Sequence, residues 1–365
     1  MSVRRVDLLV AGGGPAGLVT ALHAARAGLD VEVWEPRPGA VDKACGEGLM
    51  PGALAGLLEL GVDPAGHDFR GIRYVSGPRA ASADFRHGSG RGIRRTVLHD
   101  ALTRAVLDAG ARVEQRTVGA VRQDDEEVRT DHVRARYLVA ADGLHSPVRR
   151  ALGLDRPTTR HPRFGLRQHF ALAPWSPYVE VHWAPTVEAY VTPVAPDLVG
   201  VAVLSSAKAS YDARLDALPG LRDRLAGAEP ASVVRGAGPL RQEASRRVAG
   251  RVLLVGDAGG YVDALTGEGL ALAFAQARAA VGALVVDDPE RYERDWVRLT
   301  RRYRWLTAAL LTGTRSRAAR RAIVPAARAL PWVFDRAVNS LARPVGPPGP
   351  VPGTAGQDTE RTRCS

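Results

Sequence analysis

A glycine-rich turn near the amino terminus has the spacing of a nucleotide-binding loop. Gly12, Gly14 and Gly17 form a Gly-x-Gly-x-x-Gly pattern, and Glu35 follows 23 residues after Gly12. The first glycine permits a tight turn, the second lets a pyrophosphate approach the backbone, and the third allows a helix to pack closely on a strand. Free N–H groups at the start of that helix attract phosphate charge, and the Glu35 carboxylate can accept hydrogen bonds from ribose hydroxyls. The pattern predicts an adenine dinucleotide, either FAD or NAD.

The residues around this turn have the pattern of a strand, a helix and a second strand. An apolar run covers residues 6–10, residues 18–27 have helical spacing, and residues 31–35 alternate as a strand does. This order is the opening βαβ unit of a dinucleotide-binding sheet. Further elements are predicted as strands around residues 112–115, 117–121, 136–140 and 251–255, and as helices over residues 96–110, 267–286, 289–312 and 314–341.

The composition and the charge distribution exclude several classes of protein. Hydrophobic residues make up 45% of the chain and charged residues 24%, so intrinsic disorder is excluded as the main state. The net charge of +11 is uneven, because residues 290–344 hold thirteen Arg against four acidic residues, a net of +9. Two interpretations stay open for this excess: a genomic bias towards arginine, or a basic segment for an acidic partner or membrane surface.

The sequence predicts a cytoplasmic protein without a bound metal. Its longest apolar stretch, residues 269–286, is interrupted by Gln276 and Arg278, and is therefore a poor candidate for a membrane-spanning helix. Cys45 and Cys364 are too few for a disulfide framework and fit a reducing compartment. No His, Asp or Glu cluster has metal-ligand spacing.

Four sequence blocks are spread over roughly residues 7–274. They are the glycine turn with Glu35, Arg95-x-x-Leu98-His99-x-x-Leu102, Asp142-Gly143-x-x-Ser146-x-x-Arg149, and Gly256-Asp257-Ala258-Gly259 with Thr266-Gly267-Glu268-Gly269. Together they resemble the flavoprotein aromatic hydroxylases and the geranylgeranyl-reductase-like flavoproteins, which share one fold. The segment from Lys43 to Leu49 is more similar to the reductase branch. So is Gly260, where aromatic hydroxylases usually carry a histidine, and the proline that they place a few residues later is missing here.

The resemblance implies FAD as the resident cofactor and NAD(P)H as a transient co-substrate. Asp257 would accept hydrogen bonds from the ribityl chain, and Arg95 would contact the pyrophosphate or the ribityl chain. The helix after Gly267 would direct its N-terminal amides at the pyrimidine edge of the flavin, where reduced flavin carries negative charge. The candidate cofactor-binding residues are Gly12, Gly14, Pro15, Ala16, Gly17, Glu35, Arg37, Lys43, Cys45, Gly46, Arg95, Asp142, Gly143, Gly256, Asp257, Gly267, Glu268 and Gly269.

The middle of the chain has a different pattern. Strand-like segments at residues 179–183, 188–194 and 198–204 follow one another without intervening helices, which predicts an antiparallel sheet. With the resemblance, this implies an α/β fold: a Rossmann-like FAD-binding domain of the GR2 type, an inserted antiparallel β substrate domain, and C-terminal helices. The expected boundaries are residues 1–70, 92–160 and 245–287 for the FAD-binding domain, 71–91 and 161–244 for the substrate-domain sheet, 288–344 for the helices, and 345–365 for a disordered tail.

The inserted sheet carries the candidate substrate contacts Arg167, His169, His182, Trp183 and Tyr190. Because side chains alternate along a strand, Arg167 and His169 share one face, whereas His182 and Trp183 face opposite ways. Each could equally be an ordinary sheet residue. Cys45 could be redox-active beside the flavin or simply pack in a glycine turn. No catalytic side chain is predicted, and no Gly-x-Ser-x-Gly nucleophile motif is present.

The first hypothesis is an FAD-dependent monooxygenase that uses NAD(P)H and O2 to hydroxylate or epoxidise an apolar aromatic, polyketide or isoprenoid compound, as in the hydroxylases of phenolic natural products. The alternative is a geranylgeranyl-reductase-like enzyme that reduces C=C bonds of a prenyl chain. Both use a lipophilic small molecule, and neither defines the oligomeric state.

A remote alternative is a non-enzymatic basic protein that binds nucleic acid or a membrane surface. No nucleic-acid-binding motif supports it, so no nucleic-acid partner is expected. A compatible version is that residues 326–341 rest on a membrane. The competing interpretation, which we favour, is that the apolar face of these residues packs on the FAD-binding domain.

Overall fold

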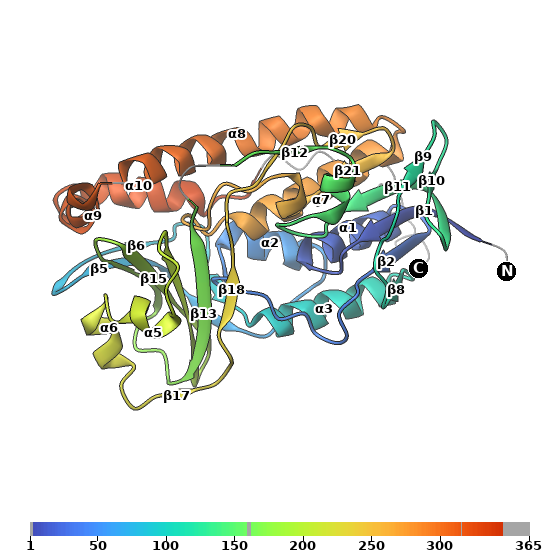
Figure 1. Ribbon diagram of the computed structural model, residues 1–365. Helices are drawn as coiled ribbons and strands as arrows, with labels where there is room; N and C mark the ends of the chain where they lie inside the picture. The colour runs from blue at the N-terminus through green and yellow to red at the C-terminus, as the bar shows by residue number, and fades with distance from the viewer. Residues whose placement is uncertain (1–2, 159–161, 315, 346–365) are drawn as a thin grey trace, which may run out of the picture.

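The chain folds around two large β-sheets, and the computed structural model describes residues 3–158, 162–314 and 316–345 (Figure 1). In the first sheet the neighbours β21, β11, β1, β2 and β8 pair in parallel, whereas β20 and β10 pair antiparallel at its margins. Its strands are β1 (Arg4–Ala11), β2 (Val31–Trp34), β8 (Arg112–Glu114), β9 (Arg122–Gln123), β10 (Val128–Arg129), β11 (Val133–Ala140), β20 (Val248–Ala249) and β21 (Val252–Leu254).

Hydrophobic core residues lie on both faces of the first sheet. Alternation along β1 places Leu8 and Val10 in the cluster under the helices, and Leu9 and Ala11 in a cluster on the opposite face. Each fully buried Leu or Val contributes about 1.5–3 kcal/mol. The helices that contribute to the first cluster are α1 (Pro15–Arg26), α2 (Pro51–Glu59), α3 (Arg95–Asp108) and α7 (Gly269–Val285).

The second sheet is antiparallel except at one junction. Strand β14 pairs in parallel with β5, with Tyr178 opposite Gly71. The antiparallel pairing expected for residues 179–204 is confirmed. The parallel junction was not expected, and it arises because β5 and β6 come from a separate segment of the chain and are not joined to β14 by a hairpin. The strand order is β17-β13-β16-β15-β14-β5-β6, with β18 also on β13. The bounds are β5 (Gly71–Ser76), β6 (Arg79–Asp84), β13 (Phe164–Ala171), β14 (Tyr178–Trp183), β15 (Val187–Ala195), β16 (Leu198–Ser205), β17 (Glu229–Pro230) and β18 (Arg235–Ala237).

Short elements join the two halves. Strand β7 (Gly90–Gly92) pairs with β3 (Gly48–Leu49) and β4 (His67–Phe69) in a small sheet of its own, not with β6. A Cβ atom at Gly92 would lie 1.7 Å from the carbonyl oxygen of Pro193, so the small sheet is pressed against β15. The remaining short elements are α4 (Pro147–Ala151), β12 (Asp155–Arg156), α5 (Tyr211–Leu215), α6 (Pro219–Arg224), β19 (Glu243–Ala244) and the 3-10 turn η1 (Gly256–Gly259).

The C-terminal segment forms three helices, α8 (Pro289–Gly313), α9 (Arg317–Ala329) and α10 (Pro331–Leu341). The single helix expected over residues 314–341 is wrong, because Leu330 has non-helical backbone angles and Pro331 begins a new helix. Figure 1 shows α8 running along one side of the molecule, with α9 and α10 near its far end over the second sheet. No helix among the described residues is long and apolar enough to cross a membrane.

Helices α9 and α10 pack on the second sheet rather than on the FAD-binding half, which corrects that expectation. The rings of Tyr74 on β5 and Phe334 on α10 lie 4.7 Å apart. Phe334 and Val338 share a cluster with Ala83 on β6. Helix α8 packs instead on α7.

Two other expectations differ from the structure. Residues 117–121 form no strand. Their apolar side chains Val118 and Val121 are half-buried against the cluster that contains Leu9 and Ala11, without pairing to a neighbouring strand. Helix α7 begins at Gly269 rather than at Gly267, because Gly267 adopts φ +69°. The domain boundary expected at residues 160–161, and the expected tail except Val345, lie outside the described residues.

Candidate functional site

An elongated cavity of about 1130 Å³ lies between the two sheets and extends to the C-terminal helices. This volume exceeds the roughly 300–1,000 Å³ of a typical small-molecule pocket, so the cavity has room for a cofactor and a substrate together. Glycines and charged residues line one end. The other end is lined by apolar residues of α8, α9 and α10: Leu306, Ala309, Leu310, Ala322, Ile323, Ala326, Val338 and Leu341.

The glycine turn lies at the first end and divides into structural and ligand-facing positions. A Cβ at Gly12, which has φ +102°, would lie 2.6 Å from the carbonyl oxygen of Ala141, and a Cβ at Gly17 would lie 1.9 Å from that of Gly12. Gly14 lines the cavity, and a Cβ there would meet no protein atom within 4 Å. Pro15 and Ala16 also line the cavity, whereas Gly17 does not. The space beside Gly14 is where a pyrophosphate fits.

Glu35 ends the second strand beside this turn. It is buried, and its Oε2 accepts hydrogen bonds from Gly13 N at 2.9 Å and Arg37 Nη2 at 3.0 Å, while its Oε1 accepts one from Arg37 Nε at 2.7 Å. Burial alone would raise the pKa of Glu35, but the hydrogen bonds and charge of Arg37 outweigh it and lower that pKa. The carboxylate is therefore ionised at neutral pH and suited to bind ribose hydroxyls.

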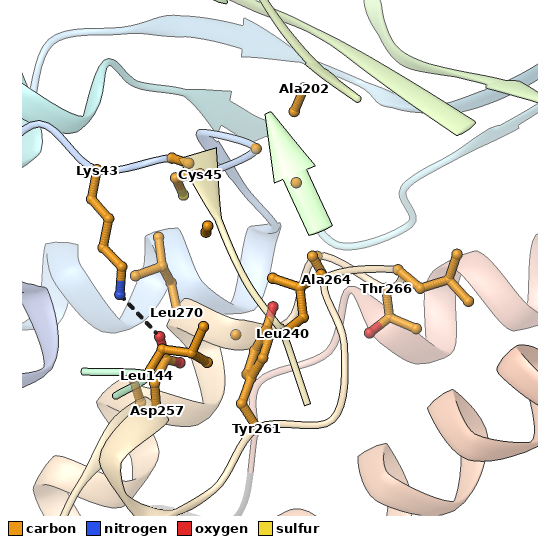
Figure 2. A pocket seen from close by; sticks show the side chains of 18 of the residues that line it. Lys43, Cys45, Leu144, Ala202, Leu240, Asp257, Tyr261, Ala264, Thr266 and Leu270 are labelled. Carbon is orange, nitrogen blue, oxygen red and sulfur yellow. Dashed lines mark hydrogen bonds and ion pairs between the residues drawn. The ribbon is translucent and has the colours of Figure 1, made fainter. Parts of the chain in front are cut away.

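Three distant segments meet at the centre of the cavity. Lys43 Nζ lies 3.4 Å from Asp257 Oδ2, and Figure 2 shows the lysine extending towards this carboxylate. A Cβ at Gly143 would lie 3.3 Å from the same ammonium nitrogen. The labelled side chains around the pair are Cys45, Leu144, Leu240, Tyr261, Ala264, Thr266 and Leu270.

Several buried polar atoms along the cavity have no hydrogen-bond partner among the described residues. Asp142 Oδ1 and Arg95 Nε are buried without a hydrogen bond, and both residues line the cavity. Burial raises the pKa of Asp142 despite hydrogen bonds from Ser146 and Val148. Unpaired buried polar groups are costly. The acceptor Asp142 Oδ1, the donor Arg95 Nε and the space beside Gly14 together fit the hydroxyls and phosphates of FAD.

The helix start beyond Asp257 is the last part of the cofactor end. Gly267 and Gly269 line the cavity, so α7 begins at the cavity wall with unpaired N–H groups and the positive end of its dipole. Glu268 lies between them but does not line the cavity. Burial raises the pKa of Glu268 to about 7, with the charge of Arg302 opposing the shift.

Arg149 is a site residue that the candidate set did not include. Its side chain is 1% exposed and donates to the carbonyl oxygens of Ala258 at 3.0 Å and Leu144 at 3.1 Å. It also pairs with Asp155. Arg149 therefore joins the Asp142 turn to the Asp257 turn. Its place in the third sequence block was the signal that could have identified it.

The five candidate substrate residues do not all reach the cavity. Arg167, Trp183 and Tyr190 line it, whereas His169 and His182 do not. As alternation predicts, His182 turns away from Trp183, and its Nε2 lies 3.0 Å from Glu180 Oε2. The substrate role expected for both histidines therefore lacks cavity contact.

His169 is instead part of a buried network with Glu47 and Arg167, which both line the cavity. Its Nε2 lies 2.6 Å from Glu47 Oε2 and its Nδ1 lies 3.1 Å from Arg167 Nη1. Glu47, at φ +59°, also accepts a hydrogen bond from Arg95 N at 2.8 Å. This network fixes the segment that carries Cys45 and Gly46, which both line the cavity. Glu47 was not among the candidate residues, because nothing local in the sequence marks its partners.

Comparison with known proteins agrees with this geometry. Residues 96–215 match the family described as FAD binding domain. The chain is 30% identical over 328 residues to digeranylgeranylglycerophospholipid reductase 1 of Methanopyrus kandleri, covering 80% of this chain and 85% of that protein. It is 28% identical over 329 residues to a menaquinone reductase of Mycolicibacterium smegmatis, covering 80% and 79%.

The fold also matches solved structures. A geranylgeranyl bacteriochlorophyll reductase-like protein from Thermoplasma acidophilum aligns with a TM-score of 0.69 and 21% identity, covering 93% of this chain and 92% of that one. At this identity the match supports the fold alone. It includes both the Rossmann-like half and the second sheet of the present structure.

Proposed function

This chain belongs to the family of FAD-dependent oxidoreductases that includes the digeranylgeranylglycerophospholipid reductases, and we propose that it reduces isolated C=C bonds in the prenyl chain of a lipophilic substrate. The observation that carries this proposal is the continuity of one cavity from the cofactor end to an apolar groove between α8 and α9. That the substrate carries a prenyl chain and that NAD(P)H is the electron donor are both parts of this proposal.

The apolar end of the cavity suits a long hydrocarbon chain. Leu306, Ile323 and Val338 line it without a charged neighbour in the lining of α8, α9 and α10. Burial of each methylene group contributes about 0.8 kcal/mol, so a prenyl chain of many carbons gains most of its binding energy there. The polar end then receives the part of the chain nearest the cofactor.

The residues at the polar end would hold and polarise the cofactor. Gly14 leaves space for a pyrophosphate, Arg95 offers a buried donor, and Asp257, which lines the cavity, would accept hydrogen bonds from the ribityl chain. The start of α7 at Gly269 stabilises negative charge on the reduced ring. When bound, FAD would supply the hydride for this reduction, with NAD(P)H as the source of the electrons and a proton completing the addition of two hydrogen atoms.

The second candidate is the monooxygenase, and the middle of the cavity favours it. Tyr74, Trp183 and Tyr190 line this region, and the rings of Tyr74 and Trp183 lie 5.6 Å apart at a steep angle. Trp183 Nε1 is buried without a hydrogen-bond partner. A planar substrate with an oxygen atom would pack against these rings and supply the missing acceptor.

Anaerobic turnover separates the two candidates. The purified, FAD-loaded protein is incubated with NAD(P)H and a prenyl compound in the absence of oxygen. The molecular mass of the product is then measured by mass spectrometry. Addition of two hydrogen atoms per reduced bond is the expected result. The reductase proposal is wrong if product forms only with oxygen and carries label from ¹⁸O2, which is the result that the monooxygenase requires.

A further inference from the structure

We propose that helices α8, α9 and α10 form a docking surface for an anionic lipid bilayer, from which the substrate passes directly into the cavity. We call the exposed face of residues 297–314 and 316–336 the docking surface. The passage of substrate depends on the proposed function above, whereas the binding of a bilayer does not.

The docking surface carries large apolar side chains that the fold leaves in water. Trp305 is 69% exposed, Trp332 is 68% exposed and Leu330 is 48% exposed. Most large apolar residues among the described part of the chain are buried. Tryptophan is favoured at the boundary between lipid and water, because its ring is apolar and its N–H needs a polar partner. Exposed tryptophans on two of these three helices therefore indicate an interfacial surface.

The same helices expose arginines that have no acidic partner. Arg317, Arg321 and Arg328 lie four and eleven residues apart along α9, which places them on one face. All three are exposed, and none forms an ion pair with another described residue. Arg336 follows Trp332 by one helical turn on α10 and is also exposed. Long arginine stems place charge at phosphate level while apolar neighbours enter the lipid.

The cavity opens beside this surface. Trp305 and Leu310 line the cavity and are also 69% and 43% exposed, so the apolar end reaches solvent along the C-terminal half of α8. Ala322 and Ala326 on α9 form the facing wall and are exposed as well. An apolar opening of this kind is unfavourable in water. A bilayer would cover it and supply a lipid to it at the same time.

Charge distinguishes a bilayer from a second copy of this chain. A symmetric dimer would place the same surface against itself, and residues 290–344 carry thirteen Arg against four acidic residues. Two such surfaces would repel each other. An anionic bilayer attracts them, at about a fivefold gain in affinity for each arginine near the surface. The surface therefore fits anionic lipid.

The test is sedimentation of the full-length, FAD-loaded protein with vesicles of phosphatidylcholine, with and without phosphatidylglycerol. We expect the protein to sediment with the anionic vesicles and to be released by salt. Combined substitution Arg317→Ser, Arg321→Ser and Arg328→Ser should lower the partition coefficient roughly a hundredfold. Trp332→Ser should lower it about tenfold, because the ring no longer enters the lipid.

Matched controls keep the result interpretable. Arg122→Ser on β9 and Val233→Ser before β18 remove an exposed charge and an exposed apolar residue outside the docking surface, and should leave partitioning unchanged. The yellow absorbance of each variant reports that it is folded. Absence of sedimentation with anionic vesicles, or equal losses in the controls, would overturn the proposal. So would a concentration-dependent dimer that Trp332→Ser abolishes.

Reduction of a detergent-dispersed prenyl substrate is measured with the same preparations. The arginine variant should retain this activity while losing vesicle binding. If the wild-type protein binds vesicles but reduces no prenyl substrate, the proposed function fails and the docking surface stands. The two outcomes are therefore distinguishable.

Discussion

Lys43 Nζ lies 3.4 Å from Asp257 Oδ2 although 214 residues separate them in the sequence. Both side chains are about one-third exposed, so the pair contributes little to stability by itself. Its importance is positional, because the ammonium group also lies against Gly143. The Lys43 side chain thus brings the segment of Cys45, the Asp142 turn and the Asp257 turn to the same part of the cavity.

Replacement of Asp257 by alanine should weaken FAD binding about ten- to a hundredfold, because hydrogen bonds to a charged carboxylate contribute about 1.5–3 kcal/mol. Titration of FAD-free protein with FAD, followed by flavin fluorescence, measures this. Asp223→Ala on α6 removes an exposed carboxylate far from the cavity and is the control. Equal affinities for wild type and Asp257→Ala would exclude a role in holding the cofactor.

Gly14 is expected to matter for ligand binding rather than for folding. Gly14→Ala should leave the melting temperature of the FAD-free protein unchanged, because the added Cβ meets no protein atom within 4 Å. FAD affinity should fall at least about tenfold, since the methyl group occupies the space where the pyrophosphate approaches. Gly220→Ala on α6, where a Cβ is equally free, should leave FAD affinity unchanged. Loss of stability in Gly14→Ala would contradict this division.

Arg149→Met should lower the free energy of unfolding by about 3 kcal/mol, because it leaves the buried carbonyl oxygens of Ala258 and Leu144 without a donor. Urea unfolding measures the effect. Arg150 pairs with the same Asp155 but is 66% exposed, so Arg150→Met should cost less than about 1 kcal/mol. Similar losses in both variants would mean that the ion pair, not the buried carbonyl contacts, is what matters.

The stability of the FAD-free protein should fall as pH rises through neutrality. The pKa of Glu268 is raised by burial from 4.5 to about 7, so the folded state holds this proton more tightly than the unfolded state. The resulting stability is complete below about pH 4.5 and is lost as pH rises through about 7. At 1.36 kcal/mol per pKa unit the loss is on the order of 3 kcal/mol.

Glu268→Gln should abolish that part of the pH dependence in urea unfolding measured across this range. A decline in stability at lower pH should remain in the variant, because burial also raises the pKa of Asp263 to about 6. Parallel stability curves for the wild type and the variant would show that Glu268 titrates normally.

Ala326→Phe should shorten the usable cavity. The phenyl ring would fill the groove between α9 and α8, so activity on long prenyl substrates should fall about tenfold or more while short ones are spared. Ala329→Phe, three residues on and outside the cavity lining, is the control. Unchanged chain-length preference in Ala326→Phe would place the substrate elsewhere.

Some of these features are encoded locally and were open to prediction. The turn from Gly12 to Gly17, the helix after it and the acid at Glu35 lie within one βαβ unit, so spacing alone indicates a dinucleotide fold. The alternating strands β14 to β16 are likewise continuous in sequence, and their period of two predicted that His182 and Trp183 face opposite ways.

Contacts between distant segments depended on the tertiary structure. Nothing near Lys43 marks Asp257 as its partner, and nothing near Glu47 marks His169, because a polar side chain carries no local signal of what it meets across the fold. The parallel pairing of β5 with β14, and the packing of α10 on that sheet, likewise follow from burial of apolar faces between segments far apart in the chain. The residues therefore encode the cofactor loop by short-range geometry, whereas long-range packing decides the shape of the cavity that faces it.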